Sequence, residues 1–132
     1  MYFTILGGLW WSFVIHSVKD NEAQYKEAKK LFLAASKGEI SLLTSTVVFF
    51  EVYWVLMSFY QRDHSDTAAT LNDLLKMSFI HIPERTVIVG ALNLFERGMG
   101  LEDAYNLIFA QLAGAQEFRT FDKKLAARFR NF

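Results

Sequence analysis

The sequence predicts an α/β protein, with three layers in α/β/α order and a central parallel sheet of about four strands. Short apolar segments alternate with longer helical segments along the whole chain, and this alternation is typical of a parallel sheet with helices on both faces. The chain has 132 residues, of which 52% are hydrophobic, and its formal net charge is zero. We therefore expect a single domain over residues 1–132 with a full core. The balanced charge does not by itself indicate a nucleic-acid partner, and the absence of cysteine excludes disulfides, a cysteine nucleophile and cysteine-based zinc sites.

The N-terminal segment, residues 1–18, carries no formal charge and allows two interpretations. The first is a buried parallel strand from Tyr2 to Leu6, a turn at Gly7-Gly8 and an apolar helix. The second is a signal peptide or membrane anchor, because eighteen apolar residues approach the length of a membrane span. Polar residues such as Ser12 and His16 and the lack of a basic N-terminus oppose the second interpretation. We expect the strand, a structural role for His16, no membrane contact and a cytoplasmic location.

Periodicity and turn residues place the remaining elements in order. Each expected helix has an apolar face, and the lysines on the outer face of the first are expected to be solvated. The expected helices run from about Glu22 to Gly38, from Val47 to about Tyr60 with a cap at Ser45 or Thr46, from Ser65 to Leu75, from Pro83 to Gly98 and from Leu101 to Gly114. The expected strands are Ile40–Thr44, Phe79–Ile82 and Glu117–Phe121.

Glu51 is the only acidic or basic residue in the helix expected from Val47 to Tyr60. That helix is apolar on nearly every side, which predicts burial, and a buried carboxylate is costly unless it is paired or binds a cation. The other interpretation is a carboxylate that reaches water. Because this helix begins where a strand ends, Glu51 should lie about 8 Å along it from the carboxyl edge of the sheet.

Two further carboxylates are expected at the same edge. Asp103 lies in the first turn of a helix, and Asp122 follows the last expected strand. A helix of about thirteen residues is about 20 Å long, and a strand of about five residues spans about 17 Å. The helix start and the strand end should therefore lie close together, at the edge where open α/β sheets bind their ligands.

Three motifs carry a resemblance to a known family. They are the helix TVVFFEVYWVL with Glu51, the pattern Gly98-x-x-Leu101-x-Asp103-Ala104, and the segment Thr120-Phe121-Asp122. In this order, over about residues 19 to 125, the chain resembles PIN domains, in particular the VapC toxins of prokaryotic toxin–antitoxin pairs. The resemblance implies a ribonuclease dependent on Mg²⁺ or Mn²⁺, with Glu51, Asp103 and Asp122 as catalytic and metal-binding carboxylates. It also implies an RNA substrate, an antitoxin partner and a homodimer.

One feature departs from the family pattern. The first strand of such proteins normally ends in an aspartate, whereas this chain has Gly7 or Leu9-Trp10 there, and Asp20 lies beyond. Three functions follow as alternatives: a metal-dependent ribonuclease, either active or weakened by the missing carboxylate, a degenerate PIN domain that binds RNA or an antitoxin without cleavage, and an unrelated α/β domain whose acids form ordinary ion pairs.

The C-terminal segment is basic and aromatic. It could follow RNA phosphates and stack bases, or it could be a solvated helix with cations near its end. Its residues are Arg119, Lys123, Lys124, Arg128 and Arg130, interleaved with Phe121, Phe129 and Phe132. Aromatic residues elsewhere, including Phe49, Tyr53 and Trp54, indicate a surface for self-association.

Overall fold

The computed structural model describes residues 3–5, 22–59, 61 and 63–131. The helix expected after Gly7-Gly8, and with it His16 and Asp20, lies outside the described residues. The chain divides into two compact units, Met1–Glu84 and Arg85–Phe132, which are described separately below. The single domain expected over the whole chain stays a prediction.

The first unit contains a parallel sheet of three strands in the order β1-β2-β3. Strand β1 covers Phe3–Ile5, β2 covers Ser41–Leu43 and β3 covers Ile80–His81. Phe3 pairs with Ser41, and Leu42 pairs with Ile80. Each strand falls inside a segment where the sequence predicts one, so the parallel α/β arrangement is confirmed for these three.

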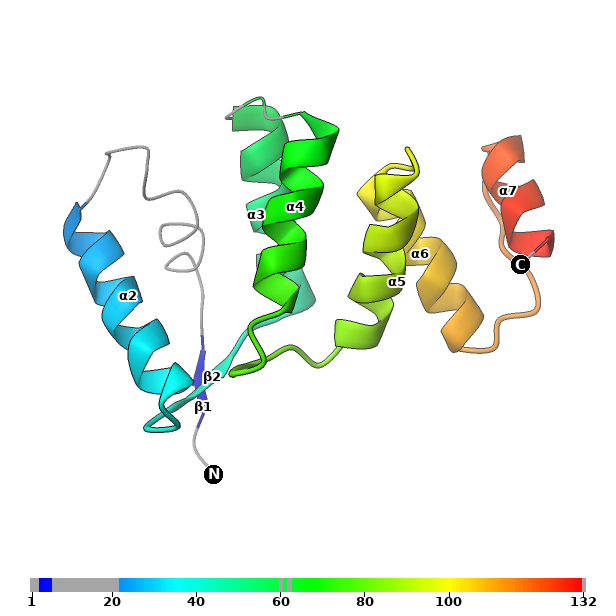
Figure 1. Ribbon diagram of the computed structural model, residues 1–132. Coiled ribbons are helices and arrows are strands. Elements are labelled where there is room, and N and C mark those ends of the chain that lie inside the picture. The colour runs from blue at the N-terminus through cyan, green and yellow to red at the C-terminus, as the bar shows by residue number, and fades with distance from the viewer. Residues whose placement is uncertain (1–2, 6–21, 60, 62, 132) are drawn as a thin grey trace. The chain divides into compact units, whose positions relative to one another are not determined.

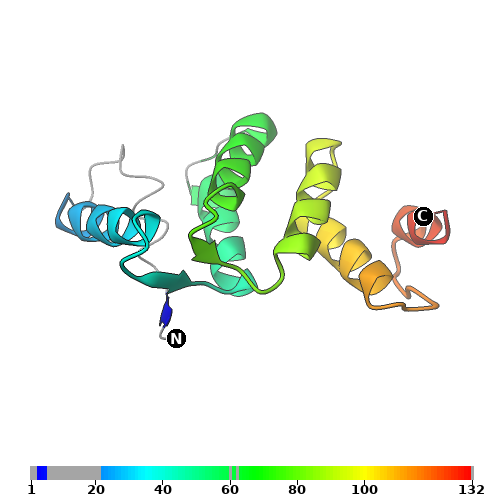
Figure 2. The ribbon, with the colours of Figure 1, turned by 60° about the horizontal axis from the view of Figure 1, so that its bottom comes forward.

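The helices of the first unit follow the predicted order, and α3 and α4 lie side by side, apart from α2 (Figures 1 and 2). They are α2 (Glu22–Ser36), α3 (Thr46–Trp54), which continues as the π-helical η1 (Val55–Phe59), and α4 (His64–Leu75). The largest fully buried side chains of this unit are Leu42, Phe49, Leu56, Leu71, Leu74 and Ile80. These apolar side chains come from the strands and from the helices that follow β2, so they form one core.

Side chains cap both α3 and α4. The Val48 N–H donates to Ser45 Oγ at 3.3 Å, as predicted for the start of α3. Helix α4 begins at His64, one residue before the predicted start at Ser65, and is capped by Asp63, whose Oδ1 accepts from the Asp66 N–H at 2.7 Å. A carboxylate three residues before a free N–H satisfies it as well as a hydroxyl would.

The second unit consists of α5 (Arg85–Glu96), α6 (Leu101–Leu112) and α7 (Lys123–Arg130) among its described residues. Helices α5 and α6 form a tight hairpin: a Cβ placed on Gly90 would lie only 3.0 Å from Ile108 Cγ2. Between them, Gly98 has a φ of +103°, and the Met99 N–H donates to the Leu94 carbonyl at 3.2 Å. This left-handed turn ends α5 and sets the start of α6.

The strand predicted for Glu117–Phe121 is not present, and the sheet therefore has three described strands instead of about four. A strand needs a neighbour to bond its backbone, and the described part of the second unit contains only helices and loops. Local contacts hold this segment instead. The Phe118 and Phe129 rings lie 5.5 Å apart, and Thr120 Oγ1 accepts from the Asp122 N–H at 3.1 Å.

Candidate acidic site

Glu51 lies in the second turn of α3 and is exposed, in agreement with the interpretation of a carboxylate that reaches water, whereas the burial predicted for the whole helix is wrong. The sequence spacing puts Val47, Glu51 and Trp54 on one face of the helix, where Val47 is 64% and Trp54 46% exposed. The opposite face, with Phe49 and Val52, is fully buried. Helix α3 thus turns an apolar face outward as well as inward. Because the Glu51 carboxylate is in contact with water, it does not need a bound cation to offset a cost of burial.

Asp103 lies in the first turn of α6 and is exposed, where the sequence predicts it. The preceding N-cap residue, Gly100, makes no side-chain hydrogen bond to the helix. The negative charges of Glu102 and Asp103 therefore stand beside uncapped N–H groups, which favours anions. The Asp103 carboxylate forms no hydrogen bond or ion pair within the described part of the chain. It is available to bind a ligand.

Asp122 has a different structural position from the predicted one, because it caps a helix instead of ending a strand. Its Oδ1 atom accepts hydrogen bonds from the Lys124 N–H at 3.0 Å and from the Leu125 N–H at 3.1 Å. These bonds satisfy two of the N–H groups that the first turn of α7 leaves free. The carboxylate is exposed, so its second oxygen remains accessible from water.

The structure leaves untested whether these three carboxylates form one metal site, because they belong to two separately described units. Glu51 belongs to the first unit, whereas Asp103 and Asp122 belong to the second. Across the described ranges, no group of three or more histidine, aspartate or glutamate side chains could hold a metal ion. The donor atoms suit a hard cation such as Mg²⁺, and the predicted cluster, whose members belong to both units, stays a prediction.

Sequence reasoning missed Glu84, which lies near the carboxyl end of β3. The Thr46 hydroxyl donates to Glu84 Oε1 at 2.6 Å in a partly buried contact. Thr46 begins α3 directly after β2, so this bond joins the segments that leave two neighbouring strands. The position could have been found from the sequence, because Pro83-Glu84 directly follows the strand predicted at Phe79–Ile82 and the same edge rule applies.

Comparisons with known proteins identify the family to which this α/β protein belongs. The parallel sheet with helical crossovers defines an α/β protein. The model of the PIN domain family matches residues 12–130, so the chain belongs to that family. No curated protein matches the chain, and no solved structure matches it.

Membership of the family has three consequences. It excludes the unrelated α/β domain considered above. It indicates a nuclease-type function in general, and PIN domains generally use divalent metal ions.

Within the described ranges, no helix combines the length and the apolar character needed to cross a membrane.

Proposed function

We propose that this protein is a metal-dependent ribonuclease in which Glu51, Asp103 and Asp122 bind Mg²⁺ or Mn²⁺. The observation that carries the proposal is the family match, which spans all three carboxylates. All three are exposed, so none needs to leave a core to reach a cation. Carboxylate oxygens are the ligands that such hard cations prefer.

The finer proposal is a VapC-like toxin that cleaves RNA in the cytoplasm of a prokaryote, forms a homodimer and is inhibited by an antitoxin. The motifs around Glu51, Asp103 and Asp122 support the toxin type, since their order resembles that of the VapC toxins. The exposed side chains of Val47 and Trp54 on α3 support self-association, because large apolar groups that face water favour burial against another protein.

Cleavage of RNA tests the proposal. The purified protein is incubated with structured and single-stranded RNA in Mg²⁺ or Mn²⁺, and the products are separated by length. We expect cleavage that EDTA stops and that Asp103→Asn abolishes. The matched control is Glu102→Gln, which removes the neighbouring exposed charge on α6 and should leave cleavage intact. Equal loss in both variants would reject Asp103 as a specific site residue.

A second candidate function is binding to RNA or to an antitoxin without cleavage. The observation that favours it is the missing aspartate, since Gly7, Leu9 and Trp10 stand where the family pattern places one. In that case the unmodified protein should cleave RNA slowly or not at all.

Restoration of the aspartate separates the two functions. The variants Gly7→Asp, Leu9→Asp and Trp10→Asp are assayed with and without Asp122→Asn. Rescue of cleavage by one of them, abolished by Asp122→Asn, would show a nuclease site that lacks one ligand. No cleavage by any folded variant would favour the binding function. Rapid cleavage by the unmodified protein would show that the three carboxylates suffice.

A further inference from the structure

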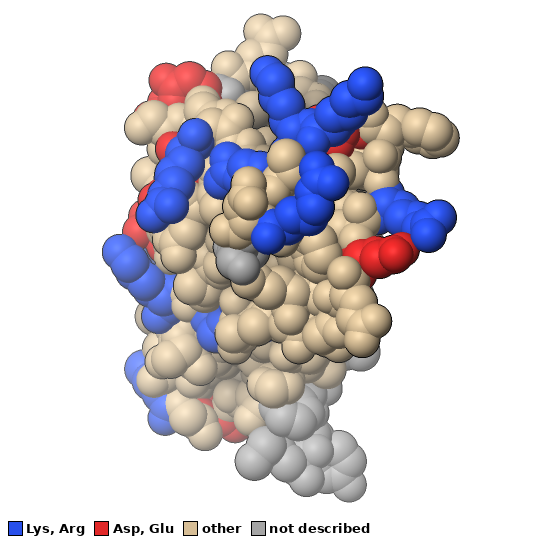
Figure 3. Space-filling model, turned by 90° about the vertical axis from the view of Figure 1, so that its right-hand side faces the viewer, with Lys and Arg blue, Asp and Glu red and all other residues tan. Residues whose placement is uncertain are grey.

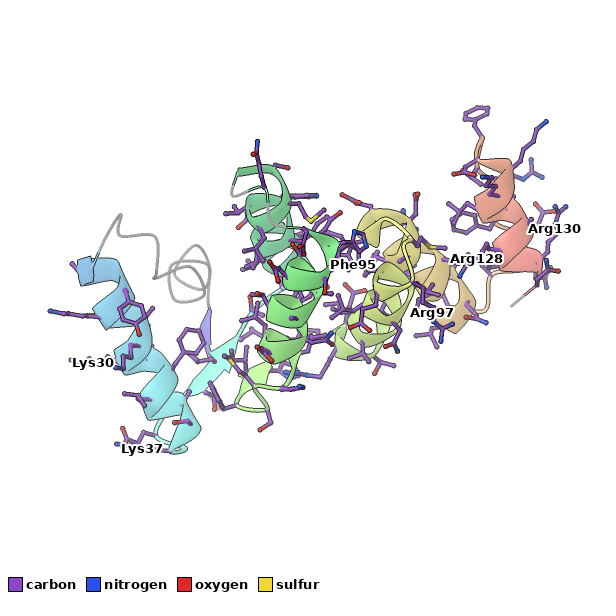
Figure 4. All side chains as sticks on the ribbon, turned by 45° about the horizontal axis from the view of Figure 1, so that its top comes forward. Lys30, Lys37, Phe95, Arg97, Arg128 and Arg130 are labelled. Atoms are coloured by element: carbon purple, nitrogen blue, oxygen red, sulfur yellow. The ribbon has the colours of Figure 1, made fainter. Side chains whose placement is uncertain are left out.

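A hollow of about 620 Å³ in the second unit is lined by three cationic side chains. Leu94 of α5 and Arg97, directly after α5, line one wall, and Lys124, Ala127 and Arg128 of α7 line the other, together with the C-cap residue Asn131. These last four residues have the spacing of one helix face. In Figure 4, Arg128 lies on the side of α7 that faces the α5–α6 pair, whereas Arg130 lies on the other side of α7. The hollow thus has cations on both walls.

Among the described residues, these cations have no anionic partner. No described carboxylate lines the hollow, and Arg97, Lys124 and Arg128 form no ion pair with another described residue. Lysines and arginines gather on the α7 side of the molecule (Figure 3). Like charges around one space repel each other, and a bound anion relieves this repulsion.

A structural role in α7 accounts for only part of this arrangement. Cations in the last turn of a helix are favourable, which explains Arg128 and Arg130 equally well. Lys124, however, lies in the first turn of α7, where the helix dipole disfavours a cation, and Arg97 lies outside that helix. Arg97, Lys124 and Arg128 all line the hollow, whereas Arg130 does not.

An exposed aromatic side chain lies close by in the sequence. The loop before α7 is held against this helix by the Phe118–Phe129 contact, with ring centroids 5.5 Å apart. Phe121, three residues before Lys124, is fully exposed. Bases of single strands stack on such rings, and their phosphates follow cationic grooves. An acidic protein segment would need the cations but not the ring.

We propose that this hollow binds backbone phosphates of single-stranded RNA, through Arg97, Lys124 and Arg128, with Phe121 as a stacking surface for a base. The proposal rests on the proposed function, because RNA is the substrate there, and it names the part of this chain that holds the RNA. Arginine offers a planar pair of donors that matches two phosphate oxygens, which suits Arg97 and Arg128 on the two walls.

The test is RNA binding without divalent metal, so that cleavage cannot interfere. Fluorescence anisotropy measures the affinity of a labelled single-stranded RNA of mixed sequence in EDTA, over a range of salt concentrations. The variant is Arg97→Gln with Arg128→Gln. The matched control is Lys30→Gln with Arg130→Gln, which removes the same charge from two exposed positions outside the hollow. Circular dichroism confirms that both fold.

We expect the Arg97/Arg128 variant to lose about 1.4 in the slope of log affinity against log salt, since each phosphate contact of a single strand contributes about 0.7. If the binding curves meet near 1 M salt, this equals about a 25-fold loss of affinity at 0.1 M. The control should lose much less, and Phe121→Ala alone should weaken binding at least about five-fold.

Two results would overturn the proposal. One is an equal loss of affinity in the variant and the control, which would mean unspecific attraction by net charge. The other is unchanged RNA binding in the variant combined with lost binding of a labelled polyglutamate peptide, which would assign the hollow to an acidic protein segment.

The same assays separate this proposal from the proposed ribonuclease. If the unmodified protein cleaves RNA in Mn²⁺ and Asp103→Asn does not, but the Arg97/Arg128 variant binds RNA normally, the nuclease stands and the hollow has another role. If RNA binds in the hollow but no variant with a restored aspartate cleaves it, the phosphate site stands and the nuclease is wrong.

Discussion

Asp122 has two proposed roles, as helix cap and as metal ligand, and two substitutions separate them. The cap depends on Oδ1, which accepts from the N–H groups of Lys124 and Leu125 at 3.0 and 3.1 Å. Asparagine keeps an oxygen at this position and caps helices about as well as aspartate, whereas alanine leaves both N–H groups without a side-chain partner. A metal site, in contrast, depends on the charge of the carboxylate.

In EDTA, Asp122→Ala should lower the free energy of unfolding by about 1 kcal/mol, equivalent to a fall of roughly 3–6 °C in the melting temperature of a domain of this size. Asp122→Asn should cost at most about 0.5 kcal/mol, the part due to its charge near the helix dipole. Thermal unfolding followed by circular dichroism measures both. Amide exchange at Lys124 and Leu125 should accelerate in the alanine variant only, because the first turn of α7 then frays.

Added Mn²⁺ gives the second half of the experiment. A cation bound at a hundred times its Kd adds about 2.7 kcal/mol to the stability of the unmodified protein. Asp122→Asn should lose most of this gain while it keeps the basal stability. If Asp122→Asn is as unstable in EDTA as Asp122→Ala, Asp122 does not act as a helix cap. If Mn²⁺ raises the stability of Asp122→Asn as much as that of the unmodified protein, Asp122 is not a metal ligand.

Three further predictions concern packing, a buried hydroxyl and the metal. Gly90→Val should lower the free energy of unfolding by roughly 1–3 kcal/mol, because the valine side chain would meet Ile108 across the α5–α6 hairpin. Adding Ile108→Ala to the same chain should restore part of this loss. Unchanged stability of Gly90→Val in a denaturant titration would contradict the close packing. Thr67→Val should be neutral or stabilising in the same titration, since the Thr67 hydroxyl is buried and has no hydrogen-bond partner among the described residues; a loss above about 1 kcal/mol would reveal a partner. Millimolar Mg²⁺ or Mn²⁺ should raise the melting temperature of the unmodified protein but not of Asp103→Asn, and no shift in either would count against the metal site.

The sequence predicted the order of elements well, because local signals determine it. Apolar periodicity located α2 to α6, whereas the C-terminal helix α7 was only one of two interpretations of the basic segment. The glycine at position 98 marked the end of α5 through its left-handed turn. The buried strands β2 and β3 were found from short apolar runs between helices. Their parallel pairing follows from the helices that connect them.

The failures involve contacts that periodicity cannot show. Glu117–Phe121 has the residue types of a strand, but a strand is defined by a hydrogen-bonded neighbour, and the contact between Phe118 and Phe129 holds this segment instead. The helix around Glu51 was expected to be buried because its residues are apolar, yet Glu51 and Trp54 on one of its faces are exposed. Hydrophobicity all around a helix therefore does not show which face the core covers.

The candidate site was predictable in its residue types but not in its geometry. Asp103 lies in the first turn of α6 as expected, whereas Asp122 caps a helix that the strand prediction did not require. Glu84 and the hollow beside Arg97 depend on contacts between segments far apart in the sequence. Such contacts leave no periodic signal in a single chain.

The central claim is that Glu51, Asp103 and Asp122 bind one divalent metal ion. The most direct measurement is a crystal structure of the protein grown with Mn²⁺, with the ion located by its anomalous scattering. We expect a manganese peak about 2.0–2.4 Å from carboxylate oxygens of Glu51 and Asp103, with Asp122 bound directly or through water. A well-ordered structure in which these three carboxylates lie apart, or in which manganese binds elsewhere, would contradict it.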